Sequence, residues 1–105
     1  IENERITAVG PVAAVTLPAG AEVISTEGLT VLPGLIDLQV RLSRLGHANV
    51  ARWDADYVPL AQRVVMPAAA RQLLLSGVTG ARDIESPLDA AISVRDRIRD
   101  RRIPG

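Results

Sequence analysis

The chain of 105 residues contains no cysteine, no lysine and no phenylalanine, and Trp53 and Tyr57 are its only aromatic residues. Without cysteine it can form neither a disulfide framework nor a site in which a thiolate acts as nucleophile or metal ligand. Without lysine it has no side-chain amine for Schiff-base chemistry. His47 is the single histidine. The chain therefore has only one imidazole for catalysis or metal binding.

An excess of charge of one sign is also absent. Twelve basic residues, all arginine, balance 12 acidic residues. The sequence thus gives no electrostatic reason to expect binding to nucleic acid or to anionic lipid. No run of 18 apolar residues occurs, and the first residues lack the charged and then apolar pattern of a signal peptide. We expect a cytoplasmic protein that binds neither nucleic acid nor membrane.

The first 32 residues are divided by glycine and proline into short runs rich in β-branched residues. Runs of this length between turn-forming residues are typical of a small antiparallel sheet. The runs cover residues 6–9, 12–17, 22–25 and 29–32.

From Leu35 the pattern changes to that of a buried parallel strand followed by a helix and a second strand. A loop is expected over residues 43–56 and a helix over 57–75, with Pro67 either kinking it or opening its second half. The second strand is expected over 78–83. Ser86 and Pro87 suit the cap and first turn of a final helix, whose last turn is basic.

Four stretches, in order, resemble the start of the amidohydrolase superfamily. The motif Pro-Gly-Leu-Ile-Asp at residues 33–37 is similar to the lead-in to that family's His-x-His metal ligands. Residues 75–83 resemble its second strand, where the family often reads Gly-Val-Thr-Thr-x-Arg-Asp. Residues 3–10 resemble the strand and turn of the small sandwich that precedes the family's barrel. Residues 93–105 are similar to the family's second helix and its exit, most like the branch of imidazolonepropionases and Xaa-Pro dipeptidases.

This resemblance implies an α/β fold: the first two βα units of a (β/α)8 TIM barrel in residues 33–105, preceded by part of a small β-sandwich in residues 1–32. A complete barrel takes about 250 residues. We therefore expect a fragment or subunit whose open strand edge is covered by the remainder of the barrel or by a partner chain, most simply in a homo-oligomer.

By resemblance, the complete protein would hydrolyse a carbon–nitrogen bond, in an amide, peptide or cyclic amide, with water activated by a divalent metal such as zinc. The two histidine positions, however, hold Gln39 and Arg41. A guanidinium has no lone pair to offer, and an amide oxygen is a weak ligand. We expect no metal to be bound by this segment and no activity from this chain alone.

Three interpretations of Gln39 and Arg41 are open. In the first, the protein has lost half of a metal site and survives as an inactive scaffold or oligomerisation subunit. Alternatively, it still hydrolyses amides with ligands outside this chain. In the third, Arg41 replaces the cation, either by pairing with a carboxylate or by clamping an anionic substrate. If Gln39 and Arg41 are in one strand, their side chains share the interior face.

Other polar residues give weaker predictions. His47, in the loop after the first strand, is a weak candidate for contact with substrate. Asp37 is expected to face away from the site and to make structural hydrogen bonds. Arg82 and Asp83 are predicted to fix the end of the second strand by an ion pair or a cap. Two further expectations concern residues 53–57: Trp53 and Tyr57 pack together or against the barrel, and Asp54 and Asp56 cap a helix.

Overall fold

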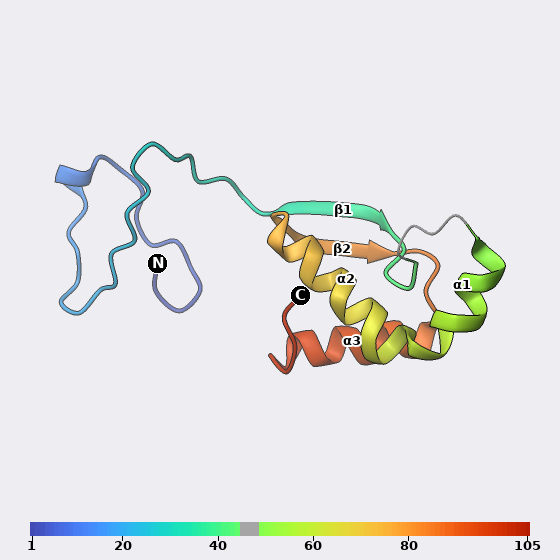
Figure 1. Ribbon diagram of the computed structural model, residues 1–105. Coiled ribbons are helices and arrows are strands. Elements are labelled where there is room, and N and C mark those ends of the chain that lie inside the picture. The colour runs from blue at the N-terminus through green and yellow to red at the C-terminus, as the bar shows by residue number, and fades with distance from the viewer. Residues whose placement is uncertain (45–48) are drawn as a thin grey trace. The chain divides into compact units, whose positions relative to one another are not determined.

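The computed structural model describes residues 1–44 and 49–105, which divide into two units, Ile1–Val31 and Leu32–Gly105. The strand predicted from Leu35 and the strand predicted over 78–83 both lie in the second unit (Figure 1). Among the described residues, no helix is long and apolar enough to span a membrane.

The first unit does not contain the predicted antiparallel sheet. Among its residues, all of which are described, the regular structure consists of the 3-10 turn η1 (Val12–Ala14) and an isolated bridge between Glu2 and Arg5. The apolar side chains of the expected strands are exposed, Val12 to 95% and Leu17 to 62%. Short strands are stable only when one face is buried, and here that burial is missing. The prediction of a β-sandwich portion is therefore wrong.

The second unit contains a parallel sheet of two strands, β1 (Leu35–Val40) and β2 (Val78–Asp83). The register pairs Leu35 with Val78 and Val40 with Asp83. Both predicted strands and their parallel pairing are confirmed. The expectation of a TIM barrel is wrong, because within the described residues the sheet has two strands and an unpaired edge on each side, whereas a barrel closes eight strands.

The segment between the strands is more helical than expected. Helix α1 (Val50–Tyr57) occupies the predicted loop, and the Asn49 side chain caps it by accepting a hydrogen bond from Arg52 N–H. The 3-10 turn η2 (Val58–Leu60) and the π-helical turn η3 (Ala61–Val65) follow, before α2 (Met66–Leu75). Pro67 lies in the first turn of α2 and so opens the second half of the helical segment, as one of the two predicted alternatives stated.

Helix α3 (Leu88–Arg99) starts later than predicted. Pro87 is its cap residue and makes no side-chain capping bond, so the prediction that Ser86 caps the helix is wrong. The stacked rings of Trp53 and Tyr57, with centroids 4.4 Å apart, confirm the predicted aromatic pair. The predicted capping role of Asp54 and Asp56 is wrong, because Asn49 caps α1.

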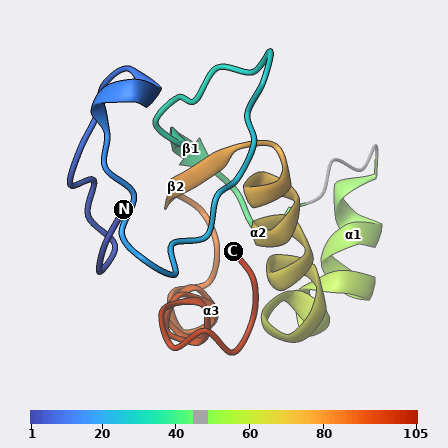
Figure 2. The ribbon, with the colours of Figure 1, turned by 90° about the vertical axis from the view of Figure 1, so that its left-hand side faces the viewer.

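Helices α2 and α3 lie side by side on one face of the sheet (Figures 1 and 2). The core is where these helices and η3 meet, and Met66 and Val94 are its most buried large side chains. In β1 only Val40 is buried, while Ile36 and Leu38 are 69% and 65% exposed. The expectation that β1 is a buried strand is therefore wrong, because within the described residues nothing covers most of it.

Candidate functional site

The carboxyl ends of the two parallel strands lie side by side. Val40 ends β1, Asp83 ends β2, and the two residues are paired in the sheet. The N–H of Ile84 donates to the Val40 carbonyl at 3.1 Å, which extends the pairing one residue beyond β2. Loops that follow the carboxyl ends of parallel strands are the usual place for ligand sites in open α/β sheets. The side chains in these two loops are therefore the first candidates for function.

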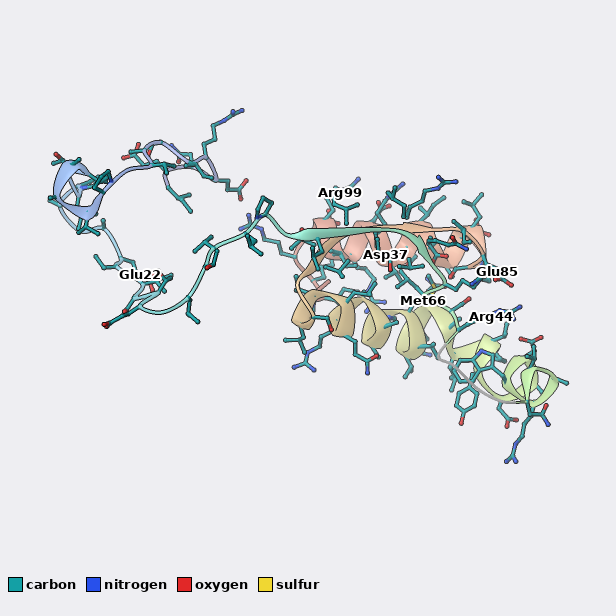
Figure 3. The ribbon with its side chains drawn as sticks, turned by 90° about the horizontal axis from the view of Figure 1, so that it is seen from above. Glu22, Asp37, Arg44, Met66, Glu85 and Arg99 are labelled. Carbon is teal, nitrogen blue, oxygen red and sulfur yellow. The ribbon has the colours of Figure 1, made fainter. Side chains whose placement is uncertain are left out.

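Two arginines from the first loop share one carboxylate from the second. Arg41 Nε lies 2.5 Å from Glu85 Oε2, and Arg44 Nη2 lies 2.8 Å from Glu85 Oε1. The N–H of Arg44 donates to the Arg41 carbonyl at 3.0 Å, so a turn places both arginines beside Glu85. Figure 3 shows Arg44 and Glu85 at the end of the unit where the strands end, with Asp37 farther back along β1. We call these three residues the arginine–glutamate cluster.

The cluster is partly exposed and carries net positive charge. The three side chains retain 46% (Arg41), 43% (Arg44) and 39% (Glu85) of their accessible surface. Ion pairs at this exposure contribute about 0 to 1 kcal/mol each to stability. Two guanidinium groups against one carboxylate leave one positive charge. The cluster is therefore better suited to binding an anion from solvent than to stabilising the fold.

A series of hydrogen bonds holds the two loops together beneath the cluster. Asp83 Oδ1 accepts from the N–H groups of Glu85 at 3.2 Å and Ser86 at 3.1 Å. Ser86 Oγ accepts from Ser43 N–H at 3.0 Å, and the Ser43 carbonyl accepts from Trp53 Nε1 at 3.3 Å. Asp83 thus caps the turn after β2, as predicted. Ser86, expected to cap α3, instead ties that turn to the loop after β1.

The structure separates the two positions that the family resemblance brought together. Gln39 lies within β1 and is exposed, and its N–H donates to Asp37 Oδ1 at 2.9 Å. Arg41 lies beyond the last residue of β1, and the strand register is irregular between Asp37 and Val40. Strand alternation therefore does not place Gln39 and Arg41 on one face. Asp37 makes the structural hydrogen bond that was predicted for it, and His47 lies outside the described residues.

Sequence reasoning missed Glu85 and Arg44. A weak signal was present, because opposite charges follow two strands that were both predicted to be parallel. Arg41 is the first residue after β1 and Glu85 is the second after β2. The sequence separation of 44 residues between Arg41 and Glu85 hid the pair from any local pattern.

The residues at this site do not fit the divalent metal that the family resemblance implies. The carboxylate nearest to Arg41 is held by two guanidinium groups, one on each oxygen. A cation binding to Glu85 would have to displace both arginines and remain close to their positive charges. Within the part of the chain that the structure describes, no three His, Cys, Asp or Glu residues are grouped as metal ligands.

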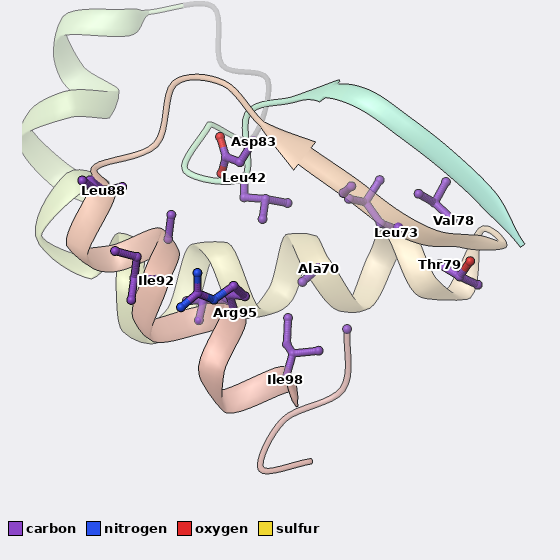
Figure 4. Close-up of a pocket in the computed structure, with 15 residues that line it drawn as sticks. Leu42, Ala70, Leu73, Val78, Thr79, Asp83, Leu88, Ile92, Arg95 and Ile98 are labelled. Carbon is purple, nitrogen blue, oxygen red and sulfur yellow. The ribbon is translucent and has the colours of Figure 1, made fainter. Parts of the chain in front are cut away.

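In the described part of the second unit, two neighbouring hollows lie between the strands and the helices. The larger, of about 370 Å³, lies among β2, α2 and α3 and is mostly apolar (Figure 4). Asp83 lines it, and Asp83 Oδ2 is buried without a hydrogen-bond partner in the described structure. Because that oxygen is buried, a ligand in the hollow could not reach it to form a hydrogen bond.

The second hollow is a groove of about 320 Å³ that runs from the end of β1 along α2. Arg41 and Arg44 line one part of it, so two of the three residues of the arginine–glutamate cluster border this groove. Its other lining residues are mainly apolar, with two polar residues from the second half of α2 and the residue after it. They are Val40, Leu42, Ala69, Gln72, Leu73 and Ser76.

Comparison with known proteins identifies no relative: no family model, no curated protein and no solved structure matches the chain. The amidohydrolase resemblance thus rests on the motifs quoted above.

Proposed function

We propose that this chain is a non-catalytic segment of an amidohydrolase-related protein, in which the arginine–glutamate cluster stands in place of a metal site. The observation that carries the proposal is the pairing of Arg41, at a family ligand position by resemblance, with Glu85 across the ends of the two strands. Of the three interpretations of Arg41, this contact supports pairing with a carboxylate.

Charge and geometry support a role without metal. A guanidinium offers donors only and cannot bind a cation. Arg44 adds a second positive charge to the same carboxylate. The hydrogen bonds among Ser43, Asp83 and Ser86 hold the two loops so that Arg41 and Glu85 stay within reach of each other.

The proposal includes a partner chain. Both edges of the two-stranded sheet are unpaired in the described structure, and the apolar side chains of β1 are largely exposed. Unpaired strand edges are sites of pairing with another chain. We propose that a partner, most simply a second copy, covers an edge of this sheet, which gives the chain a scaffold role.

The test is zinc binding together with amide hydrolysis. We expect the purified protein to hold no stoichiometric zinc by elemental analysis and to show no turnover in a screen of amide and cyclic amide substrates. The variant Arg41→His, Arg44→His should gain zinc affinity of at least tenfold in calorimetric titration, because it places two imidazoles beside the Glu85 carboxylate in place of the two guanidinium groups. The matched control, Arg52→His, places a histidine on α1, away from both strands, and should gain none.

Two results would overturn the proposal. Bound zinc with amide turnover in the unmodified protein would show that it is a metal-dependent hydrolase whose ligands come from elsewhere. No gain in zinc affinity in the double-histidine variant would show that the arginine–glutamate cluster does not stand in place of a metal site.

A further inference from the structure

We propose that the groove between the end of β1 and α2 binds a small monocarboxylate with an apolar body. The inference rests on the groove and on both guanidinium groups, and it does not depend on the relation to amidohydrolases. The volume of the groove, about 320 Å³, lies at the low end of the range of small-molecule sites, roughly 300 to 1,000 Å³.

The charged part of the ligand follows from the cluster. Arg41 contacts Glu85 through Nε and Arg44 through Nη2, and a guanidinium carries five N–H donors. Both side chains therefore have donors beyond those that face Glu85, and both residues line the groove. Two arginines and one glutamate have a net charge of +1. A ligand with one negative charge neutralises it, whereas a ligand with two would leave a net negative charge at the site. A carboxylate also matches the planar fork of a guanidinium.

The apolar part of the ligand follows from the rest of the lining. Val40, Leu42, Ala69 and Leu73 provide an apolar surface next to the arginines. Burial of alkyl or aryl groups against such a surface contributes to binding in proportion to the area removed from water. Gln72 adds an amide that can bond a polar substituent, while the Ser76 hydroxyl already donates to the Gln72 carbonyl at 3.0 Å.

Glu85 limits the affinity of this site. Its carboxylate occupies one donor of each arginine and repels a second carboxylate placed nearby. Neutralising Glu85 should therefore strengthen binding of a carboxylate, whereas neutralising either arginine should weaken it. A residue that served only the fold would not give opposite effects of this kind.

The experiment titrates hexanoate into the full chain and follows backbone amide shifts by NMR. We expect saturable shifts at Arg41, Arg44 and Gln72. Arg44→Gln should weaken binding about tenfold, since charge-assisted hydrogen bonds to carboxylates are among the stronger ones. Glu85→Gln should strengthen it about threefold, as expected for removal of one nearby charge screened by water. Arg52→Gln, which removes an exposed arginine on α1, should leave binding unchanged.

Hexanamide and inorganic phosphate are the ligand controls. Hexanamide has the same apolar body without the charge, and it should bind at least tenfold more weakly than hexanoate. Equal binding of hexanamide, tighter binding of phosphate, or no saturable shift with hexanoate would each overturn the proposal. If Arg44→Gln disturbs the amide spectrum throughout, Arg44→Lys provides the second test. This variant keeps the charge and should weaken hexanoate binding less than tenfold. Unchanged binding in both variants would again overturn the proposal.

Discussion

At the scale of single residues, charged side chains pair mostly where the sequence places them close together. Asp96 in α3 accepts hydrogen bonds from the neighbouring Arg95, from Nε at 2.9 Å and Nη2 at 2.8 Å, and Arg99 lies one turn away at 3.4 Å. The hydrogen bonds from Arg95 lower the pKa of the Asp96 carboxyl below its ordinary value, and the charges of Arg95 and Arg99 act in the same direction against a partial loss of hydration.

The first prediction concerns this carboxyl. A carboxyl whose pKa is lowered by folding stabilises the fold above its unfolded pKa, and that contribution is lost as the pH falls through the folded pKa. Arg95→Gln should therefore raise the pKa of Asp96 towards its ordinary value, measured by NMR titration of the side-chain carbonyl. Arg52→Gln should leave it unchanged. Because the group is accessible to solvent, 1 M salt should reduce the difference, and an unchanged pKa in Arg95→Gln would contradict this account.

At the scale of elements, sequence patterns predicted the parts that depend on local signals. β2 was predicted at its observed bounds and β1 at its observed start, because apolar runs ending in polar residues are distinctive, but Arg41 was expected within β1 and lies just beyond it. Helix α1 was missed because its eight residues are mixed in polarity and its Asn49 cap was not recognised. The prediction of a sheet in the first unit was wrong because the pairing of strands depends on residues distant in sequence, which local patterns do not reveal. The arginine–glutamate cluster was missed for the same reason.

The second prediction concerns the turn between α2 and β2. Gly77 follows the helix with φ of +85°, a conformation that favours glycine. Gly77→Ala should lower the free energy of unfolding by about 1 kcal/mol in urea denaturation, through backbone strain. Gly80→Ala is the matched control within β2, because its added Cβ would lie 3.5 Å from the Ile36 side chain, an ordinary contact, at a φ that is not positive. Equal losses in the two variants would show that strain at Gly77 is not the cause.

At the scale of the whole molecule, the most prominent feature is apolar surface that the described chain does not cover. Leu35, Ile36 and Leu38 of β1 are each exposed to 60% or more, beside strand edges without partners. Surfaces of this kind promote association with other chains. We therefore expect β1 to be the part of the chain that most needs a partner to cover it, whereas the helices already share a core around Met66.

The third prediction follows from that surface. The unmodified chain should self-associate at roughly 100 µM, within the concentration range where exposed strand edges associate. Sedimentation velocity should show this as an s-value that rises with concentration. Leu38→Lys should shift the distribution towards monomer, whereas Val50→Lys, which changes an apolar residue on α1 that is 50% exposed, should not. A concentration-independent monomer in the unmodified chain would exclude association through β1.

The sharing of Glu85 by two arginines also has an evolutionary consequence. If a homologue loses the carboxylate at position 85, it leaves two like charges facing each other, so a compensating change at position 41 or 44 should follow. Loss of one arginine leaves a complete ion pair and requires no compensation. In related sequences, substitution at 85 should therefore be accompanied by change at 41 or 44, while positions 41 and 44 vary more independently of each other.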